Sequence, residues 1–130
     1  MFRVLSILIA FGFFMTAANW IYDPSEAAKN LGMDLLTGMG ASTQIGDISA
    51  FFLSVSLCMI AGQRRGQSHW FYPAALLFGA AALMRTLAFV SGNAPFGTEF
   101  IVPEVVLAIV IVLAARNRAD ESSEPAGESQ

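Results

Sequence analysis

Three charged side chains, Asp47, Arg85 and Glu104, lie inside long apolar stretches of the sequence. A charge at the centre of a membrane helix costs about 2.5–3.5 kcal/mol, so such residues pair with one another or mark a site of function. An arginine with two carboxylates can form an ion pair that fixes the register of two helices. It can also form a polar pocket for the head group of a ligand, or a proton-linked site. The sequence favours the structural ion pair, with the pocket as the alternative.

The other reactive side chains form no catalytic or metal-binding pattern. The sequence has one cysteine, Cys58, and one histidine, His69. A disulfide within the chain and a zinc site made of Cys and His are therefore both excluded by count. Serines in membrane helices usually donate to a carbonyl of the preceding turn rather than act as nucleophiles. We expect a protein that is not an enzyme and that carries no cofactor and no metal ion.

The composition indicates a membrane protein with a single domain. Hydrophobic residues make up 55% of the 130 residues and charged residues only 13%, whereas soluble domains have roughly 25% charged residues. The net charge of −3 arises from acidic residues after position 119, and the rest of the chain is close to neutral. The sequence has no basic surface of the kind that binds nucleic acid, so the expected partner is the lipid bilayer.

Four apolar segments are long enough to cross a hydrocarbon layer of roughly 30 Å. They cover residues 4–22, 45–62, 70–91 and 99–115. The first could instead be a cleaved signal peptide, but its apolar run continues past the small residues of a cleavage site, which favours a retained helix. We predict an all-α fold, an antiparallel four-helix transmembrane bundle over residues 1–118. A disordered acidic tail is predicted over residues 119–130.

Residues 23–44 connect the first two spans and begin with a helix-capping pattern. The segment 23–26 reads Asp-Pro-Ser-Glu, with an N-cap residue, a proline at the first helical position and a glutamate three residues after the cap. Apolar residues then recur at helical spacing as far as Leu36. We expect a short amphipathic helix on the membrane surface, with an irregular loop as the alternative.

The distribution of Lys and Arg predicts the orientation of the spans. With four spans, one side carries Arg3, Arg64, Arg65, Arg116 and Arg118. The opposite side carries only Lys29. Positive charges accumulate on the cytoplasmic side of a membrane, so both termini are predicted to be cytoplasmic.

The three intramembrane charges lie at similar depths. At about 1.5 Å per residue, Arg85 is roughly 9 Å from the outer end of its span and Glu104 roughly 7–8 Å from the outer start of the next. Asp47 lies nearer the same surface. The third and fourth spans are joined by a short turn, so we expect an Arg85–Glu104 pair with Asp47 as a second acceptor.

Small residues predict how the helices pack. Helix association in lipid relies on close approach at small residues and on hydrogen bonds between helices. The third span has a small-residue face that includes Ala75, Gly79 and Ala82, and the second has Ala50 and Ser54 at helical spacing. We expect these two faces to meet inside the bundle.

Three features of the chain resemble a group of small bacterial four-helix membrane proteins without an assigned function, similar in appearance to DoxX-like bundles. The features are Asp23-Pro24 followed by Leu31-Gly32, Arg85 followed by Ser91-Gly92, and Pro103-Glu104 at the start of the fourth span. The resemblance implies a four-helix bundle in the inner membrane of a bacterium. It implies no particular reaction.

Two functions are compatible with this sequence. The small size and the small-residue faces favour an accessory subunit or scaffold that docks laterally on a larger bacterial membrane complex. The alternative is a protein that binds or carries a small molecule, a lipid or a quinone in a pocket of Arg85, Glu104 and Asp47. The oligomeric state does not follow from the sequence.

Overall fold

A computed structural model of the chain describes residues 2–123, which are predominantly α-helical. The elements are α1 (Phe2–Tyr22), α2 (Pro24–Asn30), α3 (Met39–Gly62), the 3-10 helix η1 (Ser68–Trp70), α4 (Phe71–Val90) and α5 (Thr98–Ser123). Within the described residues, four helical segments are long and apolar enough to cross a membrane, namely α1, α3, η1 with α4, and α5. The predicted all-α bundle with a short helix after the first span is confirmed, and it fits a multi-pass membrane protein.

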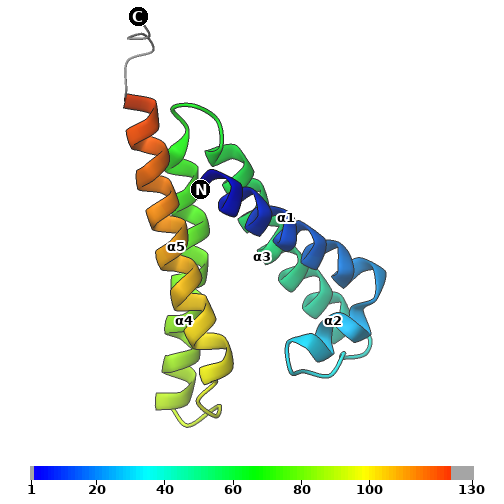
Figure 1. Cartoon of the computed structure of the whole chain (residues 1–130). Helices are drawn as coiled ribbons and strands as arrows, with labels where there is room; N and C mark the ends of the chain where they lie inside the picture. The colour runs from blue at the N-terminus through cyan, green and yellow to red at the C-terminus, as the bar shows by residue number, and fades with distance from the viewer. Residues whose placement is uncertain (1, 124–130) are drawn as a thin grey trace, which may run out of the picture.

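The four long helices form two antiparallel pairs, α1 with α3 and α4 with α5 (Figure 1). The pairs lie close together at the end of the molecule that holds the start of α1 and the α3–α4 connection. They diverge toward the opposite end, where α2 lies (Figure 1). We call these the terminal end and the α2 end. The bundle is therefore V-shaped, closed at the terminal end and open at the α2 end.

The main core lies in the terminal half, where all four long helices meet. Its buried members are Ala10, Val55, Met59, Phe71, Ala74, Ala75, Phe78, Ile111, Ala114 and Ala115. The Ser56 hydroxyl donates a hydrogen bond of 2.7 Å to the carbonyl of Ala10 and joins α3 to α1. At the end of α3, a Cβ on Gly62 would lie 2.6 Å from the ring of Phe71. Glycine is therefore required there for α4 to approach α3.

The short helix α2 packs against the end of α1. Asp23 is its N-cap and accepts a hydrogen bond of 3.1 Å from the amide of Glu26, and Pro24 is the first helical residue. Ala27 and Ala28 are buried against Trp20, which is fully buried. This second core belongs to the α1–α3 pair, and it holds α2 on that arm of the V.

Several helix boundaries differ from the prediction, among them the end of α2, which lies at Asn30 rather than near Leu36. α3 begins at Met39 rather than at residue 45, because polar residues continue the helix beyond its apolar part. Among them, Gln44 accepts a hydrogen bond of 2.9 Å from the amide of Leu36 and so fixes the preceding loop. α5 continues to Ser123, so residues 119–123 are helical rather than part of a disordered tail. The rest of the predicted tail lies outside the described residues.

The expected contact between the small-residue faces of α3 and α4 is found only in part. Ala75 and Ala82 are buried, whereas Ala50, Ser54 and Gly79 are exposed. α3 instead turns Val55 and Met59, both fully buried, toward the bundle. Larger apolar side chains bury more surface against the phenylalanines of α4, which explains why this face is the one that packs.

Candidate ligand-binding groove

Arg85 and Glu104 form the predicted ion pair between α4 and α5. The Nε of Arg85 donates to Oε1 of Glu104 at 2.9 Å. The guanidinium carbon of Arg85 also lies 4.9 Å from the centroid of the Phe100 ring, a distance at which a cation is attracted to an aromatic face. The pair therefore fixes the register of α4 against α5 in the half of this arm toward the α2 end.

The two partners of this pair differ in exposure. The side chain of Arg85 is 41% exposed and that of Glu104 only 12%. The second carboxylate oxygen, Oε2 of Glu104, is buried and has no hydrogen-bond partner among the described residues. A buried polar atom without a partner costs about 1–3 kcal/mol, and more when it is charged. The ion pair alone thus leaves one strong acceptor unsatisfied.

Glu104 lines a groove between the two arms of the V. The groove has a volume of about 410 Å³ and is lined by residues of α1, α3, α4, α5 and the α2–α3 loop. Three of its lining residues are charged, Asp47, Arg85 and Glu104, and most of the others are aromatic or aliphatic. Pockets for small molecules are commonly of this kind, with apolar walls and a few polar groups.

Four phenylalanines form the inner wall of the groove, Phe13 of α1, Phe51 and Phe52 of α3, and Phe78 of α4. Ring centroids lie 5.1 Å apart for Phe13 and Phe78 and 5.5 Å apart for Phe51 and Phe78. These separations are in the range of favourable aromatic contacts. The cluster marks the place where the packed core ends and the two arms separate.

Asp47 lines the groove from the α3 side but does not join the ion pair. Asp47 is an exposed residue. Within the described part of the chain, Arg85 forms an ion pair with Glu104 and not with Asp47. Asp47 is therefore not the second acceptor for Arg85 that the sequence predicted. The cause is the divergence of the arms, which separates the outer part of α3 from α4.

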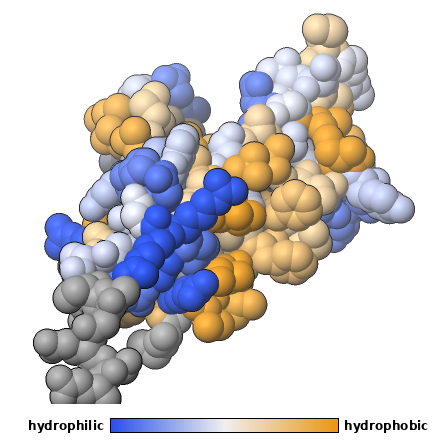
Figure 2. Space-filling model, turned by 90° about the horizontal axis from the view of Figure 1, so that it is seen from above, coloured by the Kyte–Doolittle hydropathy of each residue, from blue (hydrophilic) through white to orange (hydrophobic). Residues whose placement is uncertain are grey.

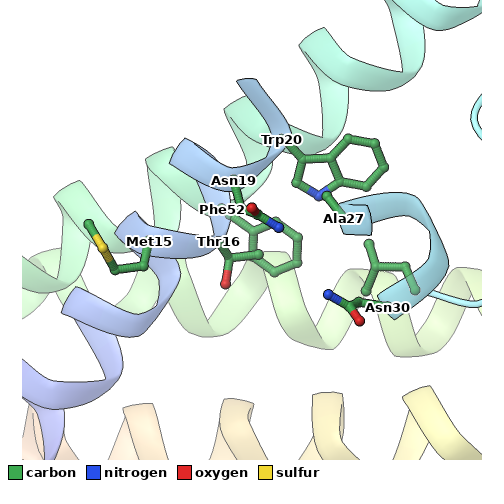
Figure 3. Close-up of a pocket in the computed structure, with 8 residues that line it drawn as sticks. Met15, Thr16, Asn19, Trp20, Ala27, Asn30 and Phe52 are labelled. Atoms are coloured by element: carbon green, nitrogen blue, oxygen red, sulfur yellow. The ribbon is translucent and has the colours of Figure 1, made fainter. Parts of the chain in front are cut away.

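A second hollow adjoins the groove between α1, α2 and α3 (Figure 3). It has a volume of about 560 Å³ and shares the lining residues Leu31 and Phe52 with the groove. Thr16 and Asn30 give it a more polar wall. Trp20 borders it, and the indole Nε1 has no hydrogen-bond partner among residues 2–123.

The sequence predicted the charged residues of this site but not its phenylalanines. In an apolar span a phenylalanine that faces a groove has the same neighbours in sequence as one that faces lipid. No signal in the pattern separates Phe13 and Phe78, which line the groove, from Phe11 and Phe14, which are exposed. Across residues 2–123, no group of three or more His, Cys, Asp or Glu side chains is placed to hold a metal ion.

No protein family, curated protein or solved structure matches this chain. The resemblance to DoxX-like bundles therefore stays a prediction from the sequence. A four-helix bundle by itself supports many functions, so the chemistry of the site is the guide to function.

Proposed function

We propose that this chain is a non-catalytic membrane protein that binds a small amphiphilic molecule, such as a lipid or a quinol, in the groove between its two arms. One observation carries the proposal. The buried Oε2 of Glu104 lacks a partner among the described residues, and Glu104 lines an apolar cavity large enough for a ligand. A ligand that donates a hydrogen bond to this oxygen would remove the cost of burying it.

The side chains of the groove restrict the chemistry of the head group. Oε2 of Glu104 accepts, so the head group must donate an O–H or N–H. Arg85 donates to Glu104 through Nε, and a guanidinium has four further N–H donors for a second oxygen of the ligand. Asp47 adds a second carboxylate, so the groove favours neutral or cationic head groups over anions. The aromatic wall suits an apolar body.

We further infer that the chain lies in a bacterial inner membrane with both termini in the cytoplasm. All arginines other than Arg85 lie at the terminal end, and Lys29 lies at the α2 end. Positively charged residues favour the cytoplasmic side. In this orientation the groove opens in the outer leaflet, so a membrane-soluble ligand would enter from the bilayer.

A pair of matched ligands tests the proposal on the purified protein in mild detergent. Decyl-benzoquinol can donate an O–H to Glu104, and its dimethyl ether cannot. The quinol is expected to raise the melting temperature in a concentration-dependent way. The ether is expected to bind at least about tenfold more weakly, since one hydrogen bond to a charged group is worth about 1.5–3 kcal/mol.

Variants of α5 provide the control for this experiment. Glu104→Gln keeps the shape of the side chain but removes the charged acceptor, and it should abolish the preference for the quinol. Glu99→Gln changes an exposed carboxylate in the first turn of the same helix and should preserve it. Equal responses of the two variants to the two ligands would contradict a role for Glu104 in binding.

A second candidate function is that of an accessory subunit docking on a larger membrane complex. The observation that favours it is the exposure of Ala50 and Ser54 on α3 and of Gly79 on α4. A Cβ added to Gly79 would meet no atom within 4 Å, so this surface is open to close approach by another helix. Gly79→Leu should release such a partner on affinity purification, and recovery of an unchanged complex would argue against this face.

A further inference from the structure

Four arginines surround a separate hollow at the terminal end. It has a volume of about 570 Å³ and is formed by Arg3 of α1, by Gln63, Arg64 and Arg65 after α3, and by Arg118, Glu121 and Ser122 of α5. In the view onto this end, strongly hydrophilic side chains gather beside the end of the described chain, with hydrophobic side chains next to them (Figure 2). Three segments far apart in the sequence thus bring their charges together.

Hydrogen bonds hold these three segments in place. The Gln63 side-chain amide donates to the Ser6 hydroxyl at 2.8 Å and joins the α3–α4 connection to α1. Arg118 donates to the backbone carbonyl of Gln63 and joins the same connection to α5. Arg118 also pairs with Glu121 one turn along its own helix. These hydrogen bonds therefore fix the relative positions of the three segments that carry the arginines.

Arg118 is the buried member of the group. Its side chain is only 10% exposed, and its Nε is buried without a hydrogen-bond partner among the described residues. Oε1 of Gln63 is also buried without a hydrogen-bond partner among the described residues. A guanidinium has five N–H donors. The described residues accept from Nη1 and Nη2 but not from Nε, so donors remain for an acceptor that carries several oxygens.

Among the described residues, the charged side chains that line the hollow are mostly positive. Four arginines line it against one carboxylate, that of Glu121, which is already paired with Arg118. The general preference for positive charges on one side of a membrane explains the number of arginines at this end. It does not explain why they converge on one hollow from three segments, or why one of them is buried.

We propose that this hollow binds a phosphate group, carried by an anionic lipid or present as free phosphate. Guanidinium groups match phosphate oxygens with pairs of parallel hydrogen bonds. Arg3 opens α1, Arg64 follows the end of α3, and Arg118 lies near the end of α5. The hollow is thus at the ends of membrane-spanning helices, at the level of the membrane surface, where basic pockets bind lipid head groups.

The test uses the full chain in mild detergent and two probes. Native mass spectrometry with equal amounts of phosphatidylglycerol and phosphatidylcholine of the same acyl chains measures the preference for an anionic lipid. Melting curves in inorganic phosphate and in chloride of equal ionic strength measure binding of free phosphate. Arg64→Gln and, separately, Arg3→Gln should each reduce phosphate-group binding about fivefold. Both residues are exposed, so the fold should persist.

Arg116→Gln is the matched control, because it removes the same charge from an exposed residue of α5 that does not line the hollow. A phosphatidylglycerol preference that Arg64→Gln weakens and Arg116→Gln preserves would identify a lipid phosphate. Stabilisation by inorganic phosphate alone, with the same pattern in the variants, would identify free phosphate. Equal losses in Arg64→Gln and Arg116→Gln, or no preference for either probe in the unaltered chain, would overturn the proposal.

Discussion

The two ends of the molecule each hold an arginine–glutamate pair, and the exposure of the partners is reversed. In the groove the side chain of Arg85 is 41% exposed and that of Glu104 is 12% exposed. At the terminal end the side chain of Arg118 is 10% exposed and that of Glu121 is 47% exposed. In each pair, the buried partner carries an atom without a hydrogen-bond partner among the described residues. Among the described residues, Oε2 of Glu104 in the groove has no donor, and Nε of Arg118 at the terminal hollow has no acceptor.

Packing explains why the two ends differ. The terminal half is filled by a core to which all four long helices contribute. At the α2 end the second core, around Trp20, belongs to the α1–α3 arm alone. The outer part of the α4–α5 arm has instead the Arg85–Glu104 pair and an aromatic contact of 5.1 Å between Phe89 and Phe96. The open groove is the space that this uneven distribution of apolar residues leaves.

The largest effect on stability is expected for Arg85→Ala. It removes the exposed partner and leaves the buried carboxylate of Glu104 without a counter-ion. Loss of one partner from a buried pair typically costs about 3–5 kcal/mol, and the exposure of Arg85 puts this case near the lower value. The free energy of unfolding from an SDS titration in mild detergent measures it. An SDS midpoint equal to that of Arg116→Ala would show that the pair does not support the fold.

Arg118→Ala is expected to have the next largest effect. It removes the hydrogen bond from the guanidinium to the Gln63 carbonyl, and a hydrogen bond to a charged group contributes about 1.5–3 kcal/mol. The same SDS titration applies, with Arg118→Lys as the companion variant. Lysine keeps the charge and much of the aliphatic stem, so it should recover part of the loss. A loss larger than that of Arg85→Ala would reverse the ranking of the two ends.

The smallest effect is expected for Glu121→Ala, which removes the exposed partner at the terminal end. The side chain is about half exposed, and exposed ion pairs contribute less than about 1 kcal/mol. Arg118 also keeps its bond to the Gln63 carbonyl in this variant. If Glu121→Ala destabilises the protein as much as Arg85→Ala does, the hydrogen bond that Arg118 keeps to the Gln63 carbonyl does not compensate for the lost counter-ion.

Much of the fold could be predicted because a bilayer makes strict demands on sequence. The apolar segments identified four helices, and the Asp-Pro-Ser-Glu segment identified the start of α2. The start of α3 and the end of α5 were missed because hydropathy marks the apolar part of a helix and not its polar extensions. In α5 the extension is supported by the Arg118–Glu121 pair and by a bond of 2.8 Å from the Ser122 hydroxyl to the Arg118 carbonyl.

The sites could be predicted only where charge was out of place. Arg85 and Glu104 are conspicuous in apolar spans, and their similar depth predicted the pair. Arg118 follows the apolar segment and was counted only as an indicator of orientation, although it is the more deeply buried of the two arginines. Ala50 and Ser54, which were expected to pack against α4, are exposed. Small residues suit a helix contact and an exposed surface equally well, so their spacing alone does not decide between the two.

The most direct test of the proposed function is native mass spectrometry of the full chain extracted from native membranes in mild detergent. We predict a chain that carries a defined small-molecule mass, lost in Glu104→Gln and retained in Glu99→Gln. A chain without any added mass, recovered in fixed stoichiometry with larger subunits, would contradict ligand binding in the groove and support the accessory-subunit function. Retention of the same mass in Glu104→Gln would place the ligand elsewhere on the molecule.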